Sequence, residues 1–198
     1  MIKTFAIAAL LPLAVNAQQP SELLQQKLAA VPQFQATFDQ QAFDFDDQLV
    51  QQSQGTVALK APLKFSWLQQ SPDQLSLVSD GVAVWYYDPY VEQVTISAIA
   101  DVLEQTPLPL LSSRDPALWA QWQVSQQQQC FVLNQPQQQG VEMQVCFNGD
   151  AINKLQLIDA QGNRTVMTLT DFNLAALADD NFNFTPPEGT FIDDQRQQ

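Results

Sequence analysis

One alternating stretch constrains the fold of this chain more than any other feature. Every second position from 57 to 67 is apolar: Val57, Leu59, Ala61, Leu63, Phe65 and Trp67. Because side chains alternate between the two faces of a strand, this pattern predicts extended chain with one buried face. Pro62 has no N–H to donate to a neighbouring strand, so it implies an edge, a bulge or a break between two strands.

Many other short segments have the composition and period of strands. They are expected near 34–38, 75–79, 82–87, 91–96, 130–134, 141–147, 152–158 and 166–172. Turn signals such as Ser79-Asp80-Gly81 and Asn148-Gly149-Asp150 separate them. Short strands at intervals of roughly ten residues are typical of an antiparallel barrel or sandwich.

Helices are expected at two places. Residues 21–31 have apolar side chains at helical spacing, with Ser21 as N-cap and Pro32 as the stop. In the middle of the chain, Thr106-Pro107 and Asp115-Pro116 each place a capping residue before a proline, which favours two short helices. Since helices inserted into a sheet must bury their apolar faces, we expect them to cover one mouth or face of a curved sheet.

The N-terminus is predicted to be a secretory signal peptide. Lys3 precedes an apolar run that ends at Val15-Asn16-Ala17, and this order of charge, apolar stretch and small residues is the signature of such a peptide. Cleavage after residue 17 leaves one expected domain, residues 18–198. Residue 18 is Gln, so the exported chain lacks the cysteine thiol that lipid attachment at a new N-terminus requires.

The charge balance excludes one large class of partners. Of the eight Lys and Arg, one lies in residues 1–17, whereas none of the 21 Asp and Glu does. Seven cations against 21 anions give the exported chain a net charge of −14. Nucleic-acid binding depends on clustered Lys and Arg, so no nucleic-acid partner is expected.

The two cysteines, Cys130 and Cys146, are expected to form a disulfide. An exported chain meets an oxidising environment, in which paired cysteines are more often bridged than free or bound to metal. A hairpin centred near Gln138 sets them opposite each other on neighbouring strands.

Catalytic chemistry has few candidates in this sequence. The chain contains no histidine, which removes Ser-His-Asp and Cys-His catalysis and histidine-containing metal sites. The acidic pairs Asp46-Asp47, Asp179-Asp180 and Asp193-Asp194 fall in expected loops and are interpreted as solvated surface. No phosphate-binding loop or dinucleotide fingerprint is present. We expect no catalytic residue, no metal and no cofactor.

An apolar sheet face with Phe65, Trp67, Leu75, Leu77 and Trp85 is, from its pattern alone, more often a filled core than a ligand cavity. Several ordered segments change this interpretation. They are Phe34-Gln35-Ala36-Thr37-Phe38, Lys60-Ala61-Pro62-Leu63-Lys64-Phe65-Ser66-Trp67, Leu77-Val78-Ser79-Asp80-Gly81, Val84-Trp85-Tyr86-Tyr87-Asp88-Pro89-Tyr90-Val91-Glu92-Gln93-Val94 and Phe184-Thr185-Pro186-Pro187-Glu188-Gly189. In this order, and with the signal peptide, the sequence resembles the LolA family of periplasmic lipoprotein carriers over nearly the whole exported chain.

The resemblance implies a fold and a site. The fold is mainly β: an incomplete, strongly curved antiparallel barrel with a lid of short helices over a hydrophobic cavity. Residues expected to line or border the cavity are Leu59, Leu63, Phe65, Trp67, Leu77 and Trp85, and the lid is expected to contribute Leu108, Leu110 and Leu111. The family usually has an arginine before the proline of the Lys-Ala-Pro segment, where it latches the lid, but here that position is Ala61.

The resemblance also implies partners and a place in the cell. A monomeric carrier in the periplasm takes acylated lipoproteins from an inner-membrane ABC transporter and gives them to an outer-membrane receptor lipoprotein. Two alternatives stay open. One is a lipid-sensing or regulatory periplasmic protein of the same fold, and the other is a carboxylate enzyme, for which a strongly raised carboxyl pKa in a polar cleft is the expected sign.

Overall fold

The computed structural model describes residues 18–105, 108–136 and 140–196. The expected signal peptide and the Thr106-Pro107 pair lie outside these residues. Five helical segments are present among the described residues: α1 (Pro20–Ala30), α2 (Ile99–Gln105), η1 (Leu108–Ser112), α3 (Pro116–Trp119) and η2 (Asp179–Phe182). The strands are β1 (Gln33–Phe43), β2 (Leu49–Lys60), β3 (Lys64–Ser71), β4 (Leu75–Asp80), β5 (Ala83–Asp88), β6 (Gln93–Ala98), β7 (Gln123–Gln127), β8 (Cys130–Asn134), β9 (Glu142–Asn148), β10 (Ala151–Ile158), β11 (Arg164–Asn173) and β12 (Phe191–Asp194).

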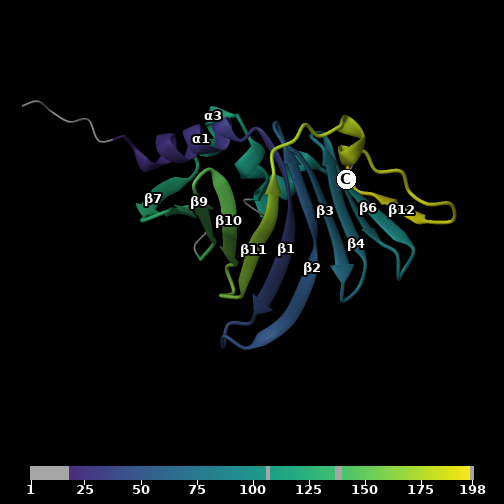
Figure 1. Ribbon diagram of the computed structural model, residues 1–198. Helices are drawn as coiled ribbons and strands as arrows, with labels where there is room; N and C mark the ends of the chain where they lie inside the picture. Colours follow the sequence, from purple (N-terminus) through teal and green to yellow (C-terminus); the bar gives the residue numbers. More distant parts are fainter. Residues whose placement is uncertain (1–17, 106–107, 137–139, 197–198) are drawn as a thin grey trace, which may run out of the picture.

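All of these strands belong to one curled sheet (Figure 1). Its order is β12-β6-β5-β4-β3-β2-β1-β11-β10-β9-β8-β7, so β12 and β7 are the two edges and the sheet is not closed into a barrel. This confirms the expected incomplete, strongly curved barrel with short helices. One pairing is not antiparallel: β12 lies parallel to β6, with Ile192 opposite Val94.

The alternating run from Val57 to Trp67 is a hairpin and not one strand. Residues 61–63 form the turn between β2 and β3, so Pro62 marks a break between two strands. Leu59 pairs with Phe65 and Val57 with Trp67. Because paired residues project from the same face, both halves of the run cover one side of the sheet. We call this side, which faces the lid, the inner face, and the opposite side the outer face.

A glycine on the inner face allows two aromatic rings to pack tightly. Phe38 pairs with Gly55, and its ring stacks on Trp67 with the centroids 3.7 Å apart. A Cβ at Gly55 clashes with the carbonyl oxygen of Leu68 and lies 2.8 Å from the Phe38 ring. The missing side chain therefore lets Phe38 cover the strand at this point, an arrangement that compensates for glycine in a sheet.

The helices differ from expectation in two details. Asp115 caps α3 as predicted, since its carboxylate accepts a hydrogen bond of 2.8 Å from the N–H of Ala117. The prediction of Ser21 as N-cap is wrong, because α1 begins at Pro20 and its N-cap is Gln19. Proline is favoured at the first helical position, where its missing N–H costs nothing. The helix α2 was not predicted, although Ile99, Val102 and Leu103 have helical spacing.

The C-terminal segment returns across the outer face (Figure 1). After β11 the chain passes over β3 and β4 through η2 and then reaches β12. Two lysines hold it: Lys60 Nζ donates to Leu177 O at 2.9 Å and to Asp179 Oδ1 at 2.8 Å, and Lys64 Nζ donates to the same oxygen at 3.2 Å. Phe184 of this segment packs against Tyr87 with the ring centroids 5.4 Å apart.

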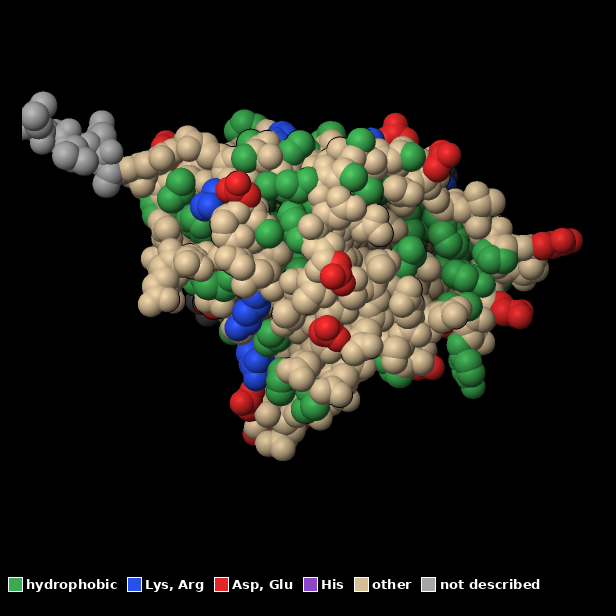
Figure 2. Space-filling view, viewed as in Figure 1, with side chains coloured by type: hydrophobic (Ala, Val, Ile, Leu, Met, Phe, Trp, Pro, Cys, Tyr) green, Lys and Arg blue, Asp and Glu red, His purple; other side chains and the backbone are tan. Residues whose placement is uncertain are grey.

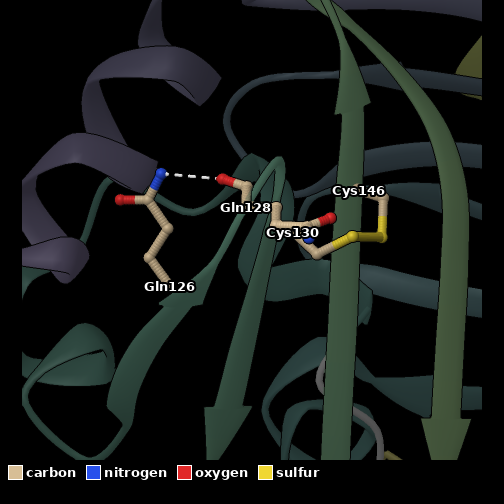
Figure 3. The surroundings of a disulfide bond; sticks show 4 residues. All are labelled: Gln126, Gln128, Cys130 and Cys146. Carbon is tan, nitrogen blue, oxygen red and sulfur yellow. Dashed lines mark hydrogen bonds between the residues drawn. A yellow bond between two sulfur atoms is a disulfide. The ribbon is translucent and has the colours of Figure 1, made fainter.

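The expected disulfide is present. Cys130 and Cys146 are directly opposite each other in the β8–β9 pair, and their sulfur atoms are bonded (Figure 3). Figure 3 also shows Gln126 Nε2 donating to the carbonyl oxygen of Gln128, which lies in the turn before Cys130. The neighbouring pairs Phe131–Val145 and Leu133–Met143 are buried on the inner face, so the bridge fastens the hairpin from the outer face.

Candidate functional site

An apolar cavity lies between the inner face of the sheet and the lid. All eleven residues that line it are apolar. Those from the sheet are Phe34 of β1, Val57 and Leu59 of β2, Phe65 and Trp67 of β3, Leu77 of β4, Leu155 of β10, and Met167 and Leu169 of β11. The register explains the set, because Phe34–Leu59, Leu59–Phe65 and Trp67–Leu77 are directly paired positions on one face.

The lid closes the cavity from the other side. Val102 of α2 and Leu111 of η1 reach the lining, and Trp119 of α3 is buried in the same apolar cluster. On α1, Leu24 and Leu28 are buried in that cluster as well. The cavity is thus a space left between two apolar surfaces, one from the sheet and one from the helical segments.

The cavity is small in this structure, with an open space of about 70 Å³. Pockets that hold drug-sized ligands are about 300–1,000 Å³. A ligand of that size therefore does not fit the cavity in this form.

Four of the six predicted sheet residues line this cavity: Leu59, Phe65, Trp67 and Leu77. Leu63 does not line it. It lies in the turn after β2 with a positive φ of 58°, and this reverses the chain before the alternation reaches it.

The expectation that Trp85 lines the cavity is wrong. Leu77 pairs with Tyr86, whereas Trp85 pairs with Val78 and so projects from the outer face. There it packs against a second apolar cluster formed by Ala83, Val94 and Ile96. The reason is the turn between β4 and β5, whose length sets the phase of the second strand and cannot be found from the alternation within either strand.

The three predicted lid residues have different outcomes. Leu111 lines the cavity, and Leu110 is buried in the main core without reaching the lining. The side chain of Leu108 lies outside the described part of the structure. Three lining residues were not predicted from the sequence: Leu155, Met167 and Leu169. They lie on β10 and β11, roughly 100 residues after β2 and β3. The alternation within their strands was visible in the sequence, but their proximity to β2 and β3 was not.

Polar contacts at the lid lie outside the cavity. The guanidinium of Arg114, between η1 and α3, donates 3.1 Å hydrogen bonds to the carbonyl oxygens of Ser113 and Leu28. Partial burial lowers the pKa of Arg114, which still leaves a cation at neutral pH. The indole N–H of Trp119 donates to Ser113 O at 3.3 Å. The segment that carries η1 and α3 is therefore joined to the end of α1 by a charged donor.

None of the eleven lining side chains is titratable, and the only heteroatoms among them are the thioether sulfur of Met167 and the indole nitrogen of Trp67. Among the helices of the described chain, none combines the length and the apolar character needed to cross a bilayer.

The fold and the cavity define a class of protein: a curved, open sheet that holds an apolar cavity under a helical lid. The chain belongs to the LolA family, since the sequence model described as "Outer membrane lipoprotein carrier protein LolA" matches residues 29–185.

Similar proteins support this assignment. A protein of Shewanella halifaxensis called "Outer-membrane lipoprotein carrier protein" is 37% identical over 203 residues, covering 99% of this chain and 98% of its own length. One of the same name from Pectobacterium carotovorum is 34% identical and covers 96% and 95%. Among solved structures, an uncharacterized conserved protein of Thermus thermophilus shares the fold with a TM-score of 0.56 at 12% identity, covering 89% of this chain and all of that one.

Proposed function

We propose that this protein carries acylated lipoproteins through the periplasm and delivers them to a receptor at the outer membrane. The observation that carries the proposal is the wholly apolar cavity under a helical lid, in a chain of the LolA family. The apolar start of the chain and its final Val15-Asn16-Ala17 serve as the signal for export. The protein acts as a monomer and catalyses no reaction.

The physical need for such a carrier follows from the acyl chains. Burial of a CH₂ group stabilises by about 0.8 kcal/mol, so one long acyl chain anchors a lipoprotein by roughly 10 kcal/mol. Three chains make spontaneous departure from a membrane negligible. A cavity of similar apolarity removes most of the free-energy cost of taking the acyl chains out of the membrane. Phe65, Trp67 and Leu77 supply the apolar surface here.

Loading and release need partners because a carrier with an apolar cavity holds its cargo about as well as a membrane does. A ligand shifts a conformational equilibrium only by its different affinities for the two states. We therefore assign loading to an ABC transporter of the inner membrane, which supplies energy, and release to an outer-membrane receptor lipoprotein with more favourable contacts.

Two measurements on the exported protein test the proposal. The protein is purified from the periplasm and its bound material is identified by mass spectrometry; triacylated lipoproteins are expected. Purified protein is also added to spheroplasts, from which it is expected to release lipoproteins into the medium. A protein that is empty in the first experiment and inactive in the second is not a lipoprotein carrier.

A further inference from the structure

The hairpin between β1 and β2 ends in an exposed apolar cluster that the cavity does not use. Phe45 is 72% exposed, Leu49 48% and Val50 62%. Single exposed apolar residues are normal on protein surfaces, but here three of them lie on one short turn and the start of the strand that follows it, and exposed apolar clusters often mark interaction sites. We call residues 44–50 the hairpin tip. In Figure 2 it is the lowest part of the molecule, where apolar and acidic side chains gather beside a basic one.

The hairpin tip is held in one conformation by its own hydrogen bonds. Asp44 Oδ1 accepts from the N–H of Asp46 at 3.0 Å and from the N–H of Gln48 at 2.9 Å. Two backbone bonds of 3.0 Å, from Asp44 to Gln48 O and from Asp47 to Asp44 O, close the turn. A surface that is already ordered loses little conformational entropy on binding, so this turn is suited to recognition.

A basic side chain of β11, the strand paired with β1, contacts the hairpin tip. The guanidinium of Arg164, at the start of β11, pairs with Asp47 and lies 3.9 Å from the centre of the Phe43 ring. The turn before β11 also lies close, since the Cβ position of Gly162 is 3.7 Å from Cβ of Phe45. The turn before β11 thus lies beside the base of the Phe45 side chain.

The charge of the hairpin tip is negative. It contains Asp44, Asp46 and Asp47, and of these only Asp47 forms an ion pair within the described chain. Anionic headgroups repel such a surface. A protein surface that combines apolar groups with Lys or Arg complements both the patch and its charge.

The hairpin tip also stands well away from the cavity. Val57 of β2 lines the cavity, and Val50 is seven residues earlier on the same strand. At about 3.3 Å per residue this separates them by about 20 Å. A partner bound at the hairpin tip therefore leaves the cavity and its lid free to exchange cargo.

We propose that the hairpin tip, residues 44–50, is a docking site for a partner protein that presents an apolar groove bordered by Lys and Arg. Phe45 and Val50 enter the groove, and Asp46 faces the basic border. The site does not depend on the proposed function, because it needs neither the cavity nor a lipid.

The test begins with photocrosslinking in cells. p-Benzoylphenylalanine is placed at position 45 of the exported protein and, as a matched control, at Tyr90, which is 90% exposed in the β5–β6 turn. Crosslinked proteins specific to position 45 are identified and purified, and their affinity for the intact exported chain is measured. Absence of any protein adduct specific to position 45 overturns the proposal.

Variants then decide whether the captured protein uses the patch. The double variant Phe45→Ser with Val50→Ser is expected to weaken binding at least tenfold, and Asp46→Lys at least threefold, with a reduced dependence on salt. Tyr90→Ser with Val91→Ser, which removes a comparable exposed pair, is expected to change affinity less than twofold. Equal affinities for tip and control variants overturn the proposal.

Further measurements on the same variants test two other occupants, a second copy of this chain and a membrane. Sedimentation that shows a dimer lost in the Phe45→Ser, Val50→Ser protein identifies a second copy as the occupant. Flotation with phosphatidylethanolamine and phosphatidylglycerol vesicles that is lost in this variant identifies a membrane. Either result overturns the docking proposal. Binding of a fluorescent acyl probe is expected to be unchanged, which separates a failure here from a failure of the carrier function.

Discussion

A guanidinium N–H of Arg114 lies 3.1 Å from the carbonyl oxygen of Leu28 and joins the η1–α3 segment to the last turn of α1. The last carbonyl groups of a helix have no partner within the helix, and they carry partial negative charge. The Leu28 oxygen accepts from the N–H of Val31 at 3.3 Å, and Arg114 adds a charged donor to it. The η1–α3 segment and α1 are therefore joined directly by a hydrogen bond.

Removal of this contact is expected to loosen the lid. Arg114→Gln removes a hydrogen bond from a charged donor, which we expect to be worth about 1 kcal/mol at this partly exposed position. Hydrogen exchange in residues 108–119 and near the end of α1 is expected to speed up several-fold. Arg196→Gln, which removes a guanidinium that pairs with Asp194 of β12 and, among the described residues, forms no hydrogen bond with residues 108–119, is the control. Equal exchange in wild type and Arg114→Gln contradicts the prediction.

A charge inside the cavity is expected to prevent acyl binding. Phe65 lines the cavity, and Phe65→Glu places a carboxylate among apolar side chains that offer it no partner. An unpaired charge in such a site is costly, so the affinity for a fluorescent fatty-acyl probe is expected to fall at least tenfold. The control is Leu68→Glu on the same strand, because Leu68 projects from the outer face and is 40% exposed. Unchanged probe binding by folded Phe65→Glu contradicts the assignment of this site.

The Cys130–Cys146 bridge is expected to stabilise the protein by constraining the unfolded chain. Closing a loop of about 15 residues contributes about 3 kcal/mol in the chain-entropy model. Urea unfolding with and without reductant measures this contribution, and the variant with both cysteines changed to Ser is expected to match the reduced protein. A thiol assay that finds two free thiols in the unreduced exported protein rules out the bridge.

The C-terminal segment is expected to be held less well in acid. Hydrogen bonds from Lys60 and then Lys64 hold the pKa of Asp179 below its ordinary value. Because the pKa is lower in the folded state, the stabilisation is present above the unfolded pKa of about 3.9 and is lost as pH falls through the folded pKa. The stability difference between wild type and Asp179→Asn is therefore expected to shrink below about pH 4. A difference that is equal at pH 7 and pH 3 contradicts this role.

Local patterns predicted much of the sheet and part of the cavity. The period of two between Val57 and Trp67 gave the buried face, and Pro62 gave the end of a strand. The hairpin of Cys130 and Cys146 was also visible, because both halves and the turn are close in sequence.

Features set by the geometry of turns or by distant parts of the chain were not predictable in the same way. Trp85 was assigned to the cavity on strand periodicity and on the match to the family's apolar positions, but the β4–β5 turn pairs it with Val78 and places it on the outer face. A shift of one residue moves every side chain to the other face. The parallel pairing of Ile192 with Val94 joins residues almost 100 positions apart, and nothing within a four-residue strand specifies its partner.

Ala61 supplies no side-chain donor from the β2–β3 turn to the lid. Ala61 N–H donates to the carbonyl oxygen of Pro32 at 2.8 Å, which places this residue beside the chain that leaves α1. Its methyl group offers no donor, whereas the arginine usual in the family offers five. Lys60 and Lys64 do not substitute for it, since both bind Asp179 on the C-terminal segment at the outer face.

Ala61→Arg is therefore expected to tighten the lid of the empty protein. From position 61 a guanidinium starts beside the end of α1 and donates to carbonyl groups of the lid. Hydrogen bonds from charged donors are worth about 1.5–3 kcal/mol, so one such bond shifts the balance between open and closed forms about tenfold or more. Hydrogen exchange in residues 108–119 is expected to slow accordingly. Ala61→Gln has a similar reach without the charge, and it is expected to slow exchange less. Equal exchange in wild type and Ala61→Arg means that other contacts already hold the lid closed, with Arg114–Leu28 as the first to examine.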